Sequence, residues 1–365
     1  MGMDSKLTKK IRVFIVDDSI LFRNFLMQNI TTDDRFEICG RAVDAFDAMR
    51  QIPMLKPDVV TLDIEMPKMS GLEFLKELLP KYPIPVILVS SLNIRVFDAL
   101  AAGAVDYVKK PDFSDPQGRE GFLESLKGKI VVASRARVRT ATQDTIVTPT
   151  TVSQEAVVRN SAVAQNANFT FGDDKIIAIG ASTGGTEAIL SVVQNFPANM
   201  PGVVITQHMP AGFTAMYAER LNRICKMEVR EAKNGDRVQR GLMLIAPGGY
   251  QMRVVRMGAG YSVTVTQEDR VNGHAPSVDV LFNSVASVAR DKAIGVILTG
   301  MGADGAAGLL RMRKNGAYTI GQDKDSCVVY GMPMEAFKIG GVCQQASLLN
   351  IPSIIYKQLG MTIVK

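Results

Sequence analysis

Short runs of apolar, often β-branched residues recur along the first third of the chain. They occupy residues 11–16, 58–63, 85–90 and 105–108, with amphipathic stretches such as 70–82 between them. Alternation of buried strands with helical patterns predicts βαβ units and a parallel sheet covered by helices on both faces. Residues 11–130 are therefore expected to form one α/β domain, which follows a short N-terminal extension at residues 1–10.

The pattern stops near residue 130. Residues 134–170 hold ten Ser or Thr and six Asn or Gln, with little periodicity. That composition is typical of a linker. The sequence thus predicts a flexible linker over residues 131–172.

Order resumes over residues 173–365, which are expected to form a second α/β domain. Apolar runs lie at 175–180, 203–206, 242–245, 253–255, 261–265 and 294–298, and helical patterns lie at 185–196, 211–224, 277–290 and 303–314. This order predicts a doubly wound, mostly parallel domain with a hairpin-like stretch near 242–266.

Composition removes several classes of protein. Residues 173–365 carry 20 basic and 15 acidic side chains, net +5, but the chain has no Trp and no Lys/Arg run longer than two residues. This favours a solvated surface, suited to an acidic protein partner, over nucleic-acid binding.

No apolar run approaches the roughly 18 residues of a membrane span, and the first residues do not resemble a signal peptide. Four widely spaced cysteines predict reduced thiols and a cytoplasmic protein.

Polar groups end the strands of the first domain. Asp17 and Asp18 follow the first apolar run, Asp63 closes the second, and Ser90 and Lys110 end two more. Because the carboxyl ends of parallel strands meet at one edge, these groups are expected to converge. Clustered carboxylates select a hard cation such as Mg²⁺, and with a hydroxyl and a lysine they predict a phosphoryl-transfer site. A lone Asp at such a place would instead be read as a helix cap.

Residues 11–130 resemble a response-regulator receiver domain, through VDDS (16–19), TLDIEMPKMSG (61–71), VSS (89–91) and AVDYVKKP (104–111). The resemblance implies a flavodoxin-like (βα)5 fold, with Asp63 as the phospho-acceptor and a histidine kinase as phospho-donor. It also implies the following site residues: Asp17, Asp18, Asp63 and the main-chain carbonyl of Glu65 for Mg²⁺, Ser90 and Lys110 for the phosphoryl group, and Tyr107 as a switch residue.

A glycine-rich turn, Gly180-Ala181-Ser182-Thr183-Gly184-Gly185, links a strand to a helix in the second domain. It lacks the Lys of a P-loop and the spacing of a dinucleotide fingerprint. It fits GxSxG, a turn that exposes a serine hydroxyl above a sheet. The alternative is that Ser182 only caps the helix.

The partners of Ser182 favour a nucleophile. His208 ends the run VVITQ, and Asp304 lies in the glycine-rich segment after IGVIL. A serine, a histidine and an aspartate that each follow a buried parallel strand indicate acyl transfer, with backbone N–H groups near Thr183 and Met301 as oxyanion donors. The chain order Ser, His, Asp differs from that of the α/β-hydrolases. His274 can be a structural or capping residue, or a residue of the substrate cleft.

Residues 175–365 resemble the catalytic domain of chemotaxis protein-glutamate methylesterases. The resemblance is carried by IGASTGGTEAI (179–189), TQHMPAGFT (206–214), APGGY (246–250), HAPSVDVLF (274–282), LTGMGADGA (298–306) and QDKDSCVVYGMPMEA (322–336). It implies Ser182 as nucleophile, His208 as base and Asp304 as orienting acid, with Thr183 and Met301 near the oxyanion. It also implies demethylation, and deamidation, of chemoreceptors without a cofactor for the esterase reaction. The protein is expected to be a monomer, peripheral at receptor arrays and activated by phosphorylation of Asp63.

Rival functions remain at this point. A signalling adaptor with a receiver and a vestigial esterase site would show the same motifs. A transcriptional regulator would need a DNA-reading helix-turn-helix, which the α/β pattern of the second domain does not supply.

Overall fold

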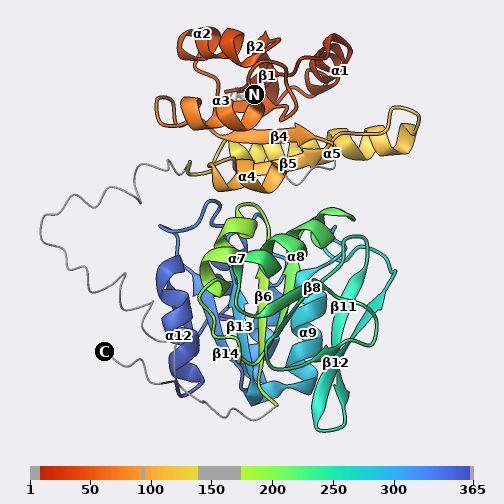
Figure 1. Cartoon of the computed structure of the whole chain (residues 1–365), viewed down its shortest axis with the longest axis vertical. Helices are drawn as coiled ribbons and strands as arrows, with labels where there is room; N and C mark the ends of the chain where they lie inside the picture. Colours follow the sequence, from red (N-terminus) through yellow and green to blue (C-terminus); the bar gives the residue numbers. More distant parts are fainter. Residues whose placement is uncertain (1–8, 92–94, 139–173, 362–365) are drawn as a thin grey trace, which may run out of the picture. The chain divides into compact units, whose positions relative to one another are not determined.

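The computed structural model describes residues 9–91, 95–138 and 174–361 of the chain. The chain divides into two compact units, Met1–Val147 and Thr148–Lys365, and each unit contains its own parallel sheet (Figure 1). The predicted linker over 131–172 overlaps the end of the last helix of the first unit, at Ala133, and its residues from 139 onward lie outside the described residues.

The N-terminal unit contains a five-stranded parallel sheet in the order β2-β1-β3-β4-β5. Its strands are β1 (Ile11–Val16), β2 (Phe36–Ala42), β3 (Val59–Leu62), β4 (Val86–Ser90) and β5 (Asp106–Lys109). Its helices are α1 (Ile20–Ile30), α2 (Ala45–Leu55), α3 (Gly71–Leu78), α4 (Arg95–Ala101) and α5 (Pro116–Ala133). The helices form two groups, α1 with α5 and α2 to α4 in a row, as right-handed crossovers require. The predicted (βα)5 fold is confirmed.

The C-terminal unit contains a seven-stranded parallel sheet in the order β15-β14-β13-β6-β7-β10-β8. Its strands are β6 (Ile176–Ala181), β7 (Gly202–Gln207), β8 (Glu228–Glu231), β10 (Leu242–Ile245), β13 (Ala293–Ile297), β14 (Tyr318–Gln322) and β15 (Gln344–Ala346). The chain builds outward from β6 through β7 and then returns to the other side of β6 as β13. Ligands of open α/β sheets bind outside the carboxyl ends of the strands at such a reversal.

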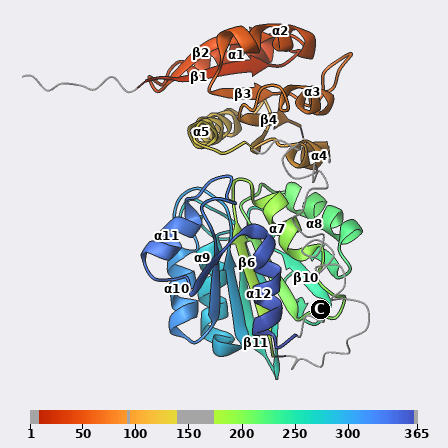
Figure 2. The same ribbon diagram turned by 90° about the vertical axis from the view of Figure 1, so that its left-hand side faces the viewer.

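Helices cover both faces of this sheet (Figure 2). One layer contains α9 (Val278–Val288), α10 (Ala306–Lys314) and α11 (Met332–Lys338), and the other contains α7 (Gly185–Val193), α8 (Phe213–Ile224) and α12 (Ile351–Gln358). Two short 3₁₀ helices, Arg290–Lys292 and Leu348–Asn350, complete the described helical segments. The strands β6, β7, β10 and β13 are buried along their whole length, which explains their continuous apolar runs.

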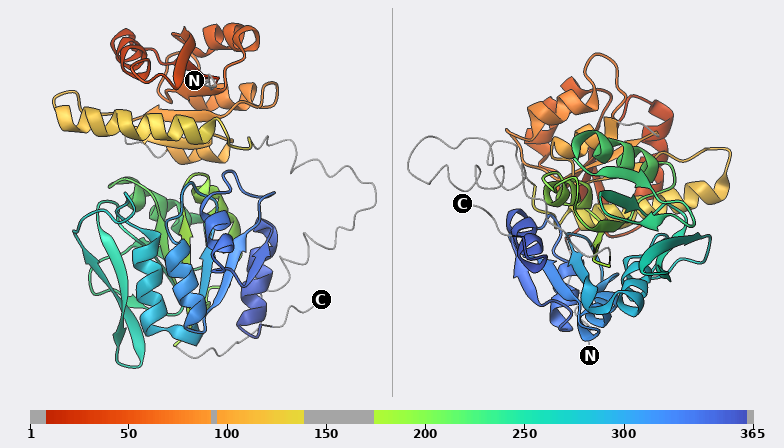
Figure 3. Two further views of the ribbon diagram at one scale, coloured as in Figure 1. Left: turned by 180° about the vertical axis from the view of Figure 1, so that it is seen from behind. Right: turned by 60° about the horizontal axis from the view of Figure 1, so that its bottom comes forward.

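A separate antiparallel sheet lies against α9 (Figure 3, teal strands). It contains β9 (Arg237–Val238), β11 (Gln251–Met257) and β12 (Gly260–Thr266) in the order β11-β12-β9. The hairpin therefore spans residues 251–266. Residues 242–245, which the sequence placed in the hairpin-like stretch, instead pair in parallel with β7 and β8 in the main sheet.

Candidate functional site

Three carboxylates converge at one edge of the N-terminal sheet. The strands β1 and β3 are neighbours, and ligand oxygens of Asp17, Asp18 and Asp63 lie within 4.8 Å of one another. Asp17 and Asp63 are buried, whereas Asp18 is exposed. Three oxygen donors at this spacing fit a hard divalent cation such as Mg²⁺.

Lys110 balances the buried charge of this cluster. Its Nζ lies 2.5 Å from Asp63 Oδ2 and 2.9 Å from Asp17 Oδ2. Burial raises the pKa of Asp63, and the Lys110 ammonium opposes that rise. For Lys110 itself, burial would lower the pKa, but the hydrogen bonds to Asp63 and Asp17 outweigh it and raise that pKa. The lysine therefore stays a cation at the carboxylate that would receive a phosphoryl group.

The remaining predicted receiver residues lie on β4, on β5 and in the segment after Asp63. Ser90 ends β4 and is buried, and its Oγ has no hydrogen-bond partner among the residues the structure describes. Such an unsatisfied hydroxyl fits a group that is to be added at Asp63. Glu65 follows Asp63 by two residues, and its N–H donates to Asp63 Oδ1 over 3.1 Å. The Tyr107 ring is buried in β5, with Lys129 Nζ 5.3 Å from its centroid.

In the second unit, Ser182 follows the central strand of the main sheet. Its N–H donates to the Thr299 carbonyl of the loop after β13, and its own carbonyl accepts the Gly185 N–H. The N-cap of α7 is Gly184, at a left-handed φ of 76°, and no side chain caps the helix. The alternative that Ser182 only caps this helix is therefore wrong.

The loops around Ser182 approach very closely. A Cβ added at Gly300 would lie 2.7 Å from the Ser182 Cβ and would also collide with Met332 Sδ. Only glycine fits there. The close approach of Gly300 to Ser182 places the next residue, Met301, which is 47% exposed, in the loop beside the serine turn, in which Thr183 is buried.

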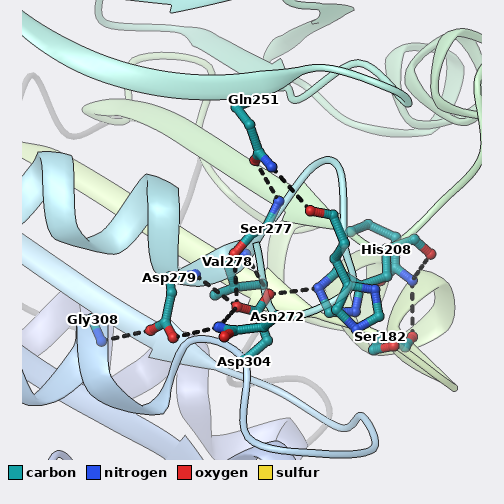
Figure 4. Close-up of polar contacts among 11 residues, drawn as sticks. Ser182, His208, Gln251, Asn272, Ser277, Val278, Asp279, Asp304 and Gly308 are labelled. Carbon is teal, nitrogen blue, oxygen red and sulfur yellow. Dashed lines mark hydrogen bonds and ion pairs between the residues drawn. The ribbon is translucent and has the colours of Figure 1, made fainter. Parts of the chain in front are cut away.

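His208 and Asp304 form a buried pair. His208 Nε2 lies 2.8 Å from Asp304 Oδ2, and the side chains are 7% and 2% exposed. His208 Nδ1 is buried, with no hydrogen-bond partner among the described residues. Figure 4 shows Ser182 and Asp304 on opposite sides of His208. Nε2 is therefore engaged by Asp304, and Nδ1 is the ring nitrogen that remains open to a further partner.

Asp304 is held by more donors than the histidine alone. They are Asn272 Nδ2, Ser277 Oγ and the backbone N–H groups of Val278 and Asp279, at 2.6 to 3.2 Å (Figure 4). Burial alone would raise the pKa of the Asp304 carboxyl, but the hydrogen bonds from His208, Asn272 and Ser277 outweigh it and hold that pKa well below its usual value. Asp304 is thus an ionised, fixed carboxylate.

A second carboxylate lies beside Asp304 and was not predicted from the sequence. Asp279 accepts hydrogen bonds from the Gly308 N–H over 2.6 Å and from Asn272 Nδ2 over 2.8 Å. Burial raises its pKa, and the neighbouring Asp304 charge adds to that rise. The Asn272 amide therefore joins two buried acids.

Gln207 is another residue that sequence reasoning missed. This last residue of β7 donates from Nε2 to the carbonyls of Ser182 over 2.9 Å and His208 over 3.3 Å. One amide thus ties the backbone of the serine turn to that of the histidine. A long-range contact of this kind leaves no motif in the sequence. The signal that could have found it is only its place directly before His208.

His274 lies at the same site. Its ring is stacked on that of His208, with centroids 3.6 Å apart and an interplanar angle of 13°. The N-cap of α9 is Ser277, so His274 does not cap this helix.

In the part of the chain that the structure describes, no helix is long and apolar enough to cross a membrane.

Comparisons with known proteins agree with both halves of this picture. Residues 177–355 match the family described as CheB methylesterase, and residues 13–117 match the response regulator receiver domain. The chain is 51% identical to "Protein-glutamate methylesterase/protein-glutamine glutaminase 2" of Syntrophomonas wolfei, over 96% of this chain and 98% of that one. It is 48% identical to the protein-glutamate methylesterase/protein-glutamine glutaminase of Syntrophotalea carbinolica, over 94% and 96% of the two chains.

Among solved structures, the CheB methylesterase catalytic domain of Thermotoga maritima matches with a TM-score of 0.49 and 34% identity. It covers 52% of this chain and 98% of its own. The response regulator domain of Thermotoga maritima CheB matches with a TM-score of 0.33 and 38% identity, over 34% and 97% of the two chains. On the near full-length identity to the two curated relatives and the two matching domain families, this chain belongs to the protein-glutamate methylesterase/protein-glutamine glutaminase family.

Proposed function

We propose that this protein hydrolyses glutamate methyl esters of chemoreceptors, and deamidates receptor glutamines, at Ser182. One observation carries the site assignment. Asp304 holds one nitrogen of the His208 ring, and the other nitrogen is buried and has no hydrogen-bond partner among the described residues, with Ser182 next to the same ring (Figure 4). A serine beside an imidazole that a carboxylate orients is an activated nucleophile.

The reaction follows from this arrangement. Ser182 Oγ attacks the ester carbonyl while its proton moves to His208 Nδ1, and the negative charge collects on the carbonyl oxygen. Backbone N–H groups near Thr183 and Met301 would stabilise that oxyanion. The C–O bond to the methoxy group then breaks, and His208 returns the proton to form methanol.

Water completes the cycle. It attacks the acyl-enzyme and gives its proton to His208, and Ser182 leaves with that proton, so that a glutamate side chain is released. With a glutamine substrate the same steps expel ammonia in place of methanol. Throughout, the ionised Asp304 stabilises the imidazolium that forms at His208.

The receiver domain supplies the control. An Asp63 carboxylate oxygen would attack the phosphorus of a phosphohistidine on a kinase, and the P–N bond to that histidine would break. Mg²⁺, held by Asp17, Asp18, Asp63 and the Glu65 carbonyl, would neutralise the phosphoryl charge. Ser90 and Lys110 would contact the transferred group. Phosphorylation then raises the esterase activity, as the added charge biases a two-state domain.

The test is methanol release from methylated receptor membranes, with and without acetyl phosphate and Mg²⁺. Release that increases with the phosphodonor supports the esterase, the receiver and their coupling. Release that does not change with the phosphodonor contradicts the control by Asp63. Absence of release in both conditions, across several receptor sets, favours the signalling adaptor with a vestigial site.

A further inference from the structure

The stacked imidazole of His274 has no place in the reaction described above. The chain has two histidines, and both lie in this one stack. A ring that lies nearly parallel to His208 covers one face of it. It does not compete for the in-plane nitrogens, which serve Asp304 and Ser182.

The backbone that carries His274 is firmly held. Val271 and His274 exchange two backbone hydrogen bonds, of 3.0 and 2.9 Å, across a turn in which Asn272 and Gly273 have positive φ. The fully buried Gln251 of β11 donates from Nε2 to the His274 carbonyl over 2.9 Å. Gln251 Oε1 also accepts the Ser277 N–H over 2.9 Å. The same few residues therefore fix both His274 and the donors to Asp304.

The stack restricts a tilt of the His208 ring that the contact to Asp304 still allows. The Nε2 contact to Asp304 fixes one atom of the ring, about which the ring can still tilt. A tilt would move Nδ1 away from the line of the Ser182 hydroxyl, and a displacement of about 1 Å can cost about 100-fold in rate. A parallel ring in contact with the face blocks such a tilt.

We propose that His274 is a positioning residue that fixes the plane of the His208 imidazole and so directs Nδ1 at Ser182. This inference rests on the proposed roles of Ser182 and His208. In this proposal the rate depends on the aromatic face of residue 274 and not on its ring nitrogens. A role in proton transfer or in substrate binding would instead depend on the nitrogens.

Two variants of the full-length, phosphodonor-activated protein test this distinction. In His274→Ala the kcat of methanol release is expected to fall about 10- to 100-fold with KM within about threefold of the wild-type value. His274→Phe keeps a stacking ring without a titratable nitrogen and is expected to stay within about fivefold of wild type, with an unchanged pH profile. Phe337→Ala, which removes a half-exposed ring from α11, is the matched control.

Two kinetic outcomes would overturn the proposal. The first is a His274→Phe protein that is folded but as inactive as His274→Ala, since the imidazole would then act chemically. The second is a His274→Ala protein with wild-type kcat.

A measurement without substrate separates this inference from the proposed function. With ¹⁵N-labelled histidine, either variant contains a single labelled side chain, His208. A sharp Nε2–H signal is expected in the wild type and in His274→Phe, and a broadened or lost one in His274→Ala. An unchanged signal in His274→Ala overturns the positioning role. If wild-type protein releases no methanol, the proposed function fails, while the NMR result still decides the role of His274.

Discussion

The two ring nitrogens of His208 differ in their surroundings. Nε2 lies 2.8 Å from Asp304 Oδ2, and Nδ1 is buried with no hydrogen-bond partner among the described residues. In chymotrypsin-like proteases the two nitrogens have the reverse roles, with Nδ1 bonded to the aspartate and Nε2 directed at the serine. In the proposed reaction the neutral imidazole would carry its proton on Nε2 and accept the Ser182 proton at Nδ1.

Replacement of the nucleophile separates the two halves of the protein. Ser182→Ala should abolish methanol release, because no oxygen remains to attack the ester, while phosphorylation of Asp63 stays normal. Methanol release and incorporation of phosphate from a labelled donor are measured on the same sample. Turnover that survives the change would reject Ser182 as nucleophile.

Replacement of the orienting acid should affect both rate and stability. Asp304→Asn puts a neutral amide where a carboxylate stabilises the imidazolium, so kcat should fall by about 10⁴-fold, the loss that the same change causes in a serine-protease triad. Chemical denaturation at several pH values gives the free energy of unfolding of both proteins.

The sign of the stability effect follows from the lowered pKa. Asp304 binds its proton more weakly folded than unfolded, so it stabilises the fold above the unfolded pKa of about 3.9. That stabilisation is lost as the pH falls below this value. The stability advantage of wild type over Asp304→Asn should thus shrink between pH 7 and pH 3, and an advantage that grew would contradict this account.

At the scale of segments, the loop that precedes α9 contributes several residues to the esterase site. Asn272 and Ser277 hold Asp304, and His274 stacks on His208. These residues come from a short loop that no apolar periodicity marks. Their contacts depend on a turn with positive φ at Asn272 and on the buried amide of Gln251.

Removal of the Asn272 amide should weaken catalysis without unfolding the domain. In Asn272→Ala, Asp304 and Asp279 lose the donor between them, so kcat/KM should fall about 10- to 100-fold, as expected for a lost hydrogen bond to a charged group. The pKa of the Asp304 carboxyl should also rise, because one of the hydrogen bonds that lower it is lost. Asn234→Ala, in an exposed turn, is the matched control. An unchanged kcat/KM would mean that Asn272 only shapes the loop.

The strands that the sequence predicted are those with apolar runs. The run at residues 11–16 is β1 and the run at 242–245 is β10, each with the predicted bounds. The strands that were not predicted include β2, β8 and β15, which all lie at sheet edges and expose much of their length. Strand β14 is interior but holds buried polar residues, and Gln322 is satisfied by the Thr299 N–H and the Ser326 carbonyl.

The same contrast holds for the site. Ser182, His208 and Asp304 could be proposed from the sequence because each follows a buried strand of one sheet. Gln207, Gln251 and Asn272 could not, because a side-chain amide carries no motif. Their partners are set by how loops far apart in the chain fold together.

For the molecule as a whole, the two units make a switch and an enzyme in one chain. Asp63→Asn should lose all stimulation by acetyl phosphate and Mg²⁺ and keep the basal rate of methanol release, because no phosphoryl group can be added. Asp34→Asn, at an exposed acid of the same unit, should respond like wild type. Stimulation that persists in Asp63→Asn would place the phospho-acceptor elsewhere.

The position of β6 between β7 and β13 also sets an order of events during synthesis. Ser182 and His208 leave the ribosome before Asp304, because β13, the strand that leads to Asp304, is made more than a hundred residues after Ser182. Domains fold as their residues emerge, and contacts between distant segments form last. The receiver can thus fold while the esterase is still incomplete, and a nascent chain gains its hydrolytic activity only after the unit that controls it has been made.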